Sequence, residues 1–237
     1  MNHRLPTPPA DAPAAAAAAA QAKAALAWTH TARFKTTASA LSELPATELA
    51  EIAFVGRSNA GKSTAINALA QQKRLAFASK TPGRTQHINL FELGPKLSPD
   101  TLFADLPGYG YAAVERNAKL RWQKVMADYL DVRRSLSGIV MLVDSRLGFT
   151  PLDLQLLEFV AGRIGNGAVK MLVLLTKADK HNKAALAAAL VAAEATLAEL
   201  TSEAADVSVA PFSALSKQGV ADAAVWLHRS IGSPAKL

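Results

Sequence analysis

The chain has 237 residues, half of them hydrophobic, which is enough for one large domain or for a domain with extensions. Lys and Arg number 26 against 19 Asp and Glu, and the resulting net charge of +7 (26 − 19) favours polyanionic partners such as RNA, DNA or anionic lipid. The absence of cysteine excludes disulfides, thiolate zinc sites and cysteine nucleophiles.

The first 27 residues, MNHRLPTPPADAPAAAAAAAQAKAALA, are rich in alanine and proline. Prolines 6, 8, 9 and 13 exclude a regular helix at the start, and the alanines that follow have no bulky side chain to bury. We expect a disordered or partly helical tail over residues 1–27 and a single domain over residues 28–237. No secretory signal is recognisable, and no apolar run approaches the roughly 18 residues of a membrane span, so we expect a cytoplasmic protein.

Beyond the tail, short apolar runs alternate with helical stretches. The sequence predicts strands at residues 51–55, 87–93, 101–105, 138–144, 170–175 and 206–212, and helices that begin near Gly61, Val114, Pro151, Asn182 and Gln218. Residues 139–143 and 171–175 are apolar throughout, as strands covered on both faces require. The alternation predicts an α/β fold of three layers, with helices on both faces of a mainly parallel sheet. Residues 31–45 are expected to join that sheet as an extra edge segment.

The helix expected over residues 114–136 has two different faces. Its apolar face carries Trp122, Val125, Met126, Tyr129 and Leu130. Its basic face carries Arg116, Lys119, Lys124 and Arg133. The basic face could meet the RNA backbone or could be an ordinary solvated surface.

A glycine-rich stretch, GRSNAGKS at residues 56–63, follows the first of these strands and opens a helix. It satisfies the pattern G-x-x-x-x-G-K-[ST], whose glycines let the backbone close around an anion at a helix N-terminus. Lys62 can then bridge the β- and γ-phosphates, and the Ser63 hydroxyl can ligate Mg²⁺. The sequence therefore predicts a nucleotide site formed by Gly56, Arg57, Ser58, Asn59, Ala60, Gly61, Lys62 and Ser63.

Three weaker signals follow, each at the end of a predicted strand. Asp105 begins DLPG, in which the aspartate can hold Mg²⁺ through water and the Gly108 amide can sense a γ-phosphate. Asp179 ends TKAD and can accept hydrogen bonds from guanine N1 and N2, a donor pair that adenine lacks. The backbone of FSAL, residues 212–215, could meet guanine O6. Because ligands bind at this edge of open α/β sheets, the order of these signals favours GTP over ATP.

Together with SKTPGRTQHIN and FSALSKQG, these motifs resemble those of the EngB/YsxC (YihA) family of bacterial GTPases, within the TrmE-Era-EngA-like class. The resemblance covers roughly residues 30–232. It implies a Ras-like P-loop NTPase fold, Mg²⁺-dependent binding of GTP and GDP, and a role in assembly of the large (50S) ribosomal subunit. Normal cell division and septation are also linked to this family.

The resemblance also assigns residues to the site. The first switch matches Gly83, Arg84, Thr85, Gln86 and His87. The second switch begins with Asp105, Leu106, Pro107 and Gly108. The residues that read the base match Thr176, Lys177, Ala178, Asp179, Phe212, Ser213 and Ala214. Ser63 and Thr85 are then the expected Mg²⁺ ligands, and the catalytic groups are expected to be Lys62, Thr85 and Gly108.

Two departures from the general GTPase pattern affect the prediction. Thr176 replaces an asparagine of the base-reading motif, which removes a side-chain amide near guanine N7. Tyr109 stands where many GTPases have a water-orienting glutamine, so we expect slow hydrolysis by the isolated protein. A potassium ion near Asn59 could replace the missing catalytic charge, or Asn59 could only shape the loop. Tyr109 and Tyr111 flank Gly110 and could pack against a neighbouring helix or stack on RNA, and packing is favoured.

The sequence thus predicts a GTPase switch that docks on a precursor of the large ribosomal subunit and its rRNA. The alternative is a nucleotide-gated RNA-binding module in which hydrolysis is incidental. A P-loop kinase that uses ATP would leave TKAD unexplained and lacks an arginine-rich lid. We expect a monomer, no membrane span and no DNA partner.

Overall fold

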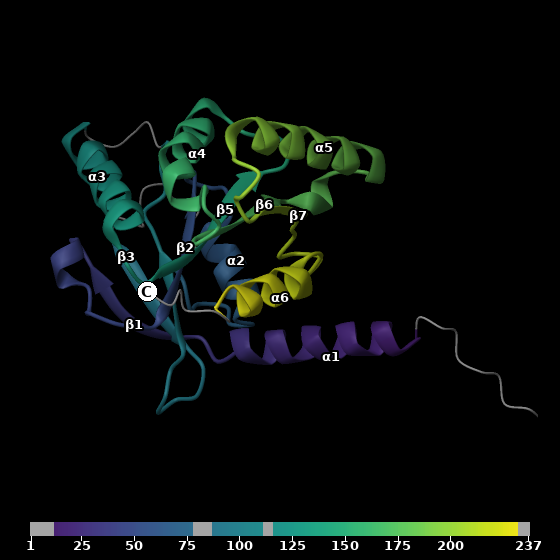
Figure 1. Cartoon of the computed structure of the whole chain (residues 1–237), viewed down its shortest axis with the longest axis horizontal. Coiled ribbons are helices and arrows are strands. Elements are labelled where there is room, and N and C mark those ends of the chain that lie inside the picture. The colour runs from purple at the N-terminus through teal and green to yellow at the C-terminus, as the bar shows by residue number, and fades with distance from the viewer. Residues whose placement is uncertain (1–11, 78–86, 111–115, 232–237) are drawn as a thin grey trace, which may run out of the picture.

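Seven strands form one sheet, with helices packed on both of its faces (Figure 1). The structure is a computed structural model and describes residues 12–77, 87–110 and 116–231. The strands are β1 (Arg33–Ala38), β2 (Ala50–Gly56), β3 (Ile88–Leu93), β4 (Thr101–Asp105), β5 (Leu136–Asp144), β6 (Lys170–Thr176) and β7 (Val207–Pro211). Their spatial order is β1-β3-β4-β2-β5-β6-β7. The predicted α/β fold with a mainly parallel sheet is confirmed.

The run from β4 through β2, β5 and β6 to β7 is parallel, whereas β1, β3 and β4 pair antiparallel. The apolar runs of β5 and β6 are buried, as expected for strands covered on both faces. The edge segment expected over residues 31–45 is present as β1, which pairs with β3 at one end of the sheet. The carboxyl ends of the parallel strands therefore meet at one edge, where ligands bind in such sheets.

Among the described helices, three pack on each face of the sheet. The first core cluster contains side chains of α3 (Arg116–Val132), α4 (Pro151–Ile164) and α5 (Lys183–Leu200). The second contains side chains of α1 (Ala12–Thr29), α2 (Lys62–Leu69) and α6 (Val220–Ser230). Two single turns of 3-10 helix, η1 (Leu41–Glu43) and η2 (Ala178–Lys180), complete the described elements. No described helix is long and apolar enough to cross a bilayer.

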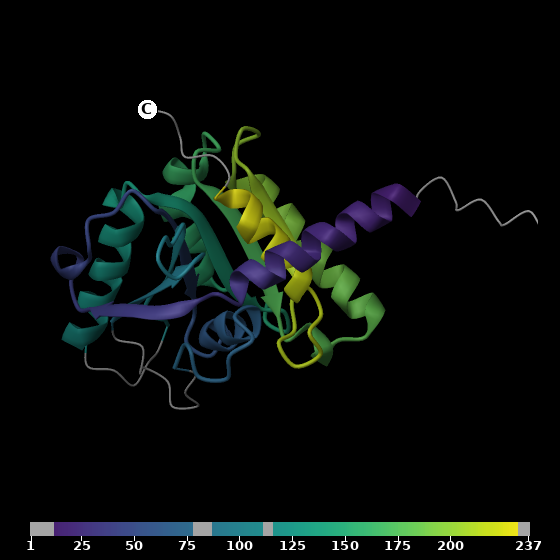
Figure 2. The same ribbon diagram turned by 90° about the horizontal axis from the view of Figure 1, so that it is seen from below.

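In the alanine-rich segment, residues 12–29 form the helix α1, and the sequence expectation allowed for a partly helical segment here. Its first alanines are exposed, but its C-terminal end packs beside α6, as Figure 2 shows. Ala25 is fully buried, and the Trp28 ring meets Phe103 and His228 edge-on at centroid distances of 5.8 and 5.3 Å. Trp28 lies beyond the predicted tail boundary, so the sequence expectation separated the helix from the residue that anchors it.

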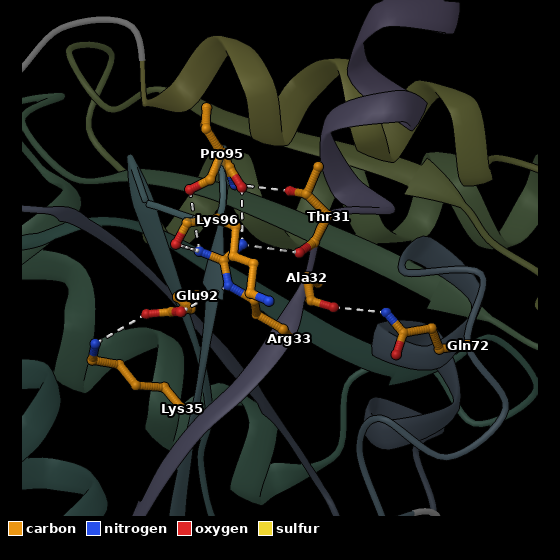
Figure 3. A network of polar contacts seen from close by, with 9 residues as sticks. Thr31, Ala32, Arg33, Lys35, Gln72, Glu92, Pro95 and Lys96 are labelled. Atoms are coloured by element: carbon orange, nitrogen blue, oxygen red, sulfur yellow. Dashed lines mark hydrogen bonds and ion pairs between the residues drawn. The ribbon is translucent and has the colours of Figure 1, made fainter. Parts of the chain in front are cut away.

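Polar contacts fix the turn that joins α1 to β1 (Figure 3). Thr31 Oγ1 accepts a hydrogen bond from the Gly94 amide at 2.8 Å. Gln72, which follows α2, donates to the Ala32 carbonyl at 2.6 Å. Arg33 Nε donates to Glu92 at 2.7 Å, and its other nitrogens reach carbonyls of the turn between β3 and β4. The start of the sheet is thereby joined to the β3–β4 hairpin and to the end of α2.

Helix α3 ends at Val132, four residues earlier than predicted. Met126, Tyr129 and Leu130 are buried, as the predicted apolar face requires. Arg133, however, does not belong to a solvated basic face: its guanidinium donates to the fully buried Glu51 carboxylate, with Nη2 at 2.6 Å from Oε1. Tyr129 donates to the same carboxylate. A buried carboxylate needs such donors, and Arg133 is therefore a structural residue.

Candidate functional site

The glycine-rich loop lies between β2 and α2, where the sequence predicts it. A Cβ at Gly56 would lie 2.8 Å from the Leu142 carbonyl oxygen, so only glycine fits beside β5. Gly61 is the N-cap of α2 and has φ 97°, a left-handed conformation that favours glycine. The first turn of α2 contains Lys62 and Ser63, whose side chains start at the positive end of the helix dipole. This geometry suits a phosphate group.

Lys62 and Asp105 form a buried ion pair beneath this loop. Asp105 ends β4, and the parallel pairing of β4 with β2 places it beside the start of α2. Ser63 Oγ lies 3.5 Å from Asp105 Oδ2. A hydroxyl and a carboxylate next to a phosphate loop are the hard oxygen ligands that Mg²⁺ prefers, so these two residues fit the ion.

The two segments expected to read the base are joined to each other. Ser213 Oγ donates to Asp179 Oδ1 at 2.6 Å, and the Ala178 amide donates to the Phe212 carbonyl at 3.1 Å. The Ser213 hydrogen bond lowers the pKa of Asp179 below its ordinary value. Asp179 is therefore held as a carboxylate at the edge of the sheet, which is the form that can accept from guanine N1 and N2.

The base-reading segment that starts at Thr176, called the base loop below, is also joined to the phosphate loop. Thr176 Oγ1 donates to the Ala60 carbonyl at 2.7 Å and lies 3.1 Å from the Val143 carbonyl oxygen. Lys177 Nζ donates to the Asn59 carbonyl at 3.0 Å. Thr176 is buried, so in place of an amide directed at the base it supplies a hydroxyl that ties β6 to the phosphate loop.

The second switch begins beside the phosphate loop. The Tyr109 carbonyl accepts from the Ser58 amide at 2.8 Å, and a Cβ at Gly108 would lie 3.2 Å from that same nitrogen. The Tyr109 ring is buried, and its hydroxyl donates to Asp153 of α4 at 2.7 Å. The expectation that Tyr109 packs against a neighbouring helix is confirmed, and its hydroxyl is engaged by a side chain of that helix. Burial, followed by the Asp153 carboxylate, raises the pKa of Tyr109 well above its ordinary value.

Most of the predicted site residues lie in the described part of the chain. The phosphate-loop, second-switch and base-loop residues meet at one edge of the sheet, through the contacts given above. His87 is exposed, and its Nδ1 lies 3.0 Å from Ser39 Oγ, a surface position. Gly83, Arg84, Thr85 and Gln86, together with Tyr111, lie outside the described residues.

Sequence reasoning missed three charged residues around the phosphate loop. Asp144 is the last residue of β5, Arg146 follows this strand, and Asp153 lies in the first turn of α4. All three line a cavity of about 240 Å³ whose wall also includes Asn59 and Lys177. The only sequence signal was the position of Asp144 at the end of a buried strand, which is where the carboxylates of such sites gather.

Comparison with known proteins agrees with this geometry. Residues 51–177 match the family model described as 50S ribosome-binding GTPase. A probable GTP-binding protein EngB of Acidovorax ebreus is 57% identical over 207 residues, which is 86% of this chain and 91% of that protein. The chain belongs to the EngB family of GTP-binding proteins.

Further comparisons extend this result. The EngB protein of Polaromonas sp. is 54% identical over 208 residues, 86% of this chain and 82% of that protein. Among solved structures, a probable GTP-binding protein engB aligns with a TM-score of 0.57 at 22% identity, over 77% of this chain and 99% of that one. Era in complex with MgGDPNP and nucleotides of 16S ribosomal RNA aligns with a TM-score of 0.63 at 20% identity, over 81% of this chain and 60% of that one. At these identities the structural matches show the shared fold.

Proposed function

We propose that the protein binds GTP and GDP, hydrolyses GTP slowly, and acts as a switch in assembly of the large (50S) ribosomal subunit. The proposal rests on the contacts that join the base-reading segments to each other and to the phosphate loop. Ser213 donates a hydrogen bond to Asp179, and Lys177 donates one to the Asn59 carbonyl. This arrangement supports a guanine at one end of the site and phosphates at the other.

The bound nucleotide would be accompanied by Mg²⁺. Ser63 would ligate the ion directly, Asp105 would hold it through water, and Thr85 of the first switch would supply a second hydroxyl. When bound, the ion would neutralise charge on the β- and γ-phosphates. Binding also requires Lys62 to exchange its ion pair with Asp105 for contacts with phosphate oxygens. The Gly108 amide would detect the γ-phosphate and so distinguish GTP from GDP.

Slow hydrolysis follows from the position of Tyr109. Its hydroxyl is bonded to Asp153, so it cannot orient a water as a glutamine amide does. The missing catalytic contribution would come from K⁺ bound near Asn59, which is exposed and has a left-handed φ of 67°. Exchange of K⁺ for Na⁺ in the assay buffer should then slow turnover, and unchanged affinity and turnover would exclude the ion.

The ribosomal role rests on membership of the EngB family and on the net charge of +7, which suits rRNA. In this proposal the GTP form docks on a large-subunit precursor in the cytoplasm as a monomer, without DNA, and hydrolysis permits release. Effects on cell division and septation would follow from ribosome supply. The buried Tyr109 also favours a second candidate, a nucleotide-gated rRNA-binding module with incidental hydrolysis. Turnover stimulated by purified precursors supports the switch, whereas tight GTP-dependent binding without stimulation supports the module.

Nucleotide affinity is the direct test of the site. Fluorescent GDP and GTP analogues are titrated against the intact chain and Asp179→Asn, with ATP, GTP and XTP as competitors. Exchange of a carboxylate for an amide at the base edge should lower guanine affinity at least tenfold and raise xanthine affinity, because xanthine presents an oxygen where guanine has its amino group. Asp128→Asn is the matched control, since Asp128 is partly exposed on α3 and pairs only with Lys124 among described residues. Equal competition by ATP, or no effect of Asp179→Asn, contradicts the proposal.

A further inference from the structure

The carboxylate of Asp144, at the end of β5, lines the same cavity as residues of the phosphate loop. Asp144 is the last residue of β5, and its side chain is only 9% exposed. Arg146 donates to both of its oxygens, with Nε at 2.9 Å from Oδ1 and Nη2 at 2.7 Å from Oδ2. Lys177 Nζ donates to Oδ2 at 2.6 Å. Although burial alone would raise the pKa of Asp144, the hydrogen bonds from Arg146 and Lys177 hold it well below its ordinary value.

Lys177 therefore has two fixed partners on different segments. Its ammonium bonds to Asp144 on β5 and to the Asn59 carbonyl in the phosphate loop. Its backbone has φ 59°, a left-handed conformation, directly before the turn that contains Asp179. With its ammonium held at one end and its backbone at the other, the methylene stem of Lys177 is restrained along the site.

The two bonds differ in strength. The bond to Asp144 joins two full charges, one of them nearly buried, whereas the bond to Asn59 has a neutral acceptor. Without the carboxylate, the ammonium would remain partly buried with a single carbonyl, and the flexible lysine stem would regain rotamers that leave the site. The ion pair with Asp144 therefore fixes the position of the Lys177 side chain before nucleotide binds.

We propose that Asp144 is a positioning residue for guanine nucleotide, which acts by holding Lys177 across the base and phosphate loops. Arg146 assists by holding the carboxylate of Asp144 in place. This inference rests on the proposed function, because it requires that the nucleotide lies along Lys177. It adds a determinant of affinity on β5, outside the loops identified from the sequence.

A different explanation must be separated from this one. Asp144 also accepts from the Arg146 backbone amide at 3.1 Å, so it could simply shape the loop after β5. In that case its removal would weaken nucleotide binding by an amount independent of Lys177. A double-mutant cycle distinguishes the two, because residues that act through one contact are not additive.

The experiment measures the Kd of fluorescent GDP for the intact chain, Asp144→Asn, Lys177→Met and the double variant. We expect Asp144→Asn to bind about tenfold more weakly, the size of one charge-assisted hydrogen bond. The double variant should bind no more weakly than Lys177→Met alone. Losses that multiply in the double variant, or an Asp144→Asn variant that binds as wild type, overturn the inference.

Controls separate folding from binding. Thermal unfolding of each variant is recorded, and if Asp144→Asn does not fold, Asp144→Ser replaces it, since its hydroxyl can still accept from the Arg146 amide. Asp128→Asn removes a partly exposed aspartate that pairs with Lys124, and this variant should bind GDP as wild type. If the wild-type chain binds no guanine nucleotide, the proposed function and this inference fail together. If the wild type binds and Asp144 proves independent of Lys177, only this inference fails.

Discussion

The hydrogen bond between Tyr109 and Asp153 can be removed by a single atom change, Tyr109→Phe. The ring would stay buried against α4, but Asp153 Oδ1 would lose its donor at 2.7 Å. Asp153 is 2% exposed, and its other oxygen keeps the two hydrogen bonds from Thr150. A hydrogen bond to a charged group contributes about 1.5–3 kcal/mol, and a buried acceptor left without it costs a similar amount. For a chain of this length we expect the melting temperature to fall by roughly 3–12 °C.

Thermal unfolding of Tyr109→Phe, Asp153→Asn and the double variant tests this magnitude. The double variant should be less destabilised than the sum of the single variants, because both remove the same bond. GTP turnover of Tyr109→Phe should not increase, since phenylalanine cannot orient a water. If Tyr109→Phe melts within about 1 °C of wild type, the hydrogen bond to Asp153 contributes much less than charge-assisted bonds usually do. The proposal that this bond keeps Tyr109 from acting on a water would then lose its support.

Two further predictions concern stability. Trp28→Ala removes a large ring that is 8% exposed and should lower the free energy of unfolding by about 3–5 kcal/mol in urea titrations; a change below about 1 kcal/mol would mean that α1 does not stabilise the domain. Alkaline pH should also destabilise the protein, because burial raises the pKa of both Tyr109 and Tyr129 above their unfolded value. The unfolded chain then loses these protons first, so the contribution of the two tyrosines to stability is constant below about pH 10 and falls above it. Melting temperatures recorded across this range should fall less steeply for Tyr109→Phe, and equal slopes would contradict the assignment.

The strands and most helices could be predicted because their signals are local. The apolar runs of β5 and β6 and the spacing of Met126, Tyr129 and Leu130 are periodic within a few residues. The role of α1 could not be predicted in this way. Alanine favours helix but has little surface to bury, and the partners of Trp28 are Phe103 and His228, far away in the sequence. Arg133 was misplaced for a similar reason, since its partner Glu51 lies 82 residues away.

The site residues show the same difference between local signals, which could be predicted, and contacts between distant residues, which could not. The phosphate and base loops have fixed spacings imposed by the shape of a nucleotide, so short motifs reveal them. Asp144 and Asp153 obey no such spacing. Their roles arise from contacts with Lys177 and Tyr109, which lie 33 and 44 residues away, and a single aspartate in the sequence does not reveal so distant a partner. Thr176 shows the opposite case: its position was identified, but its contact with Ala60 required the structure.

The pairing of α1 with α6 has a consequence for synthesis of the protein on the ribosome. Gln21 accepts a hydrogen bond from Arg229, and these residues are separated by 208 positions. The contacts of α1 with α6 can therefore form only after α6 has been synthesised. Before α6 is synthesised, Trp28 lacks its contact with His228, and the face of the sheet on which α6 packs is not fully covered. The core on this face of the sheet is therefore completed only when both α1 and α6 have been synthesised.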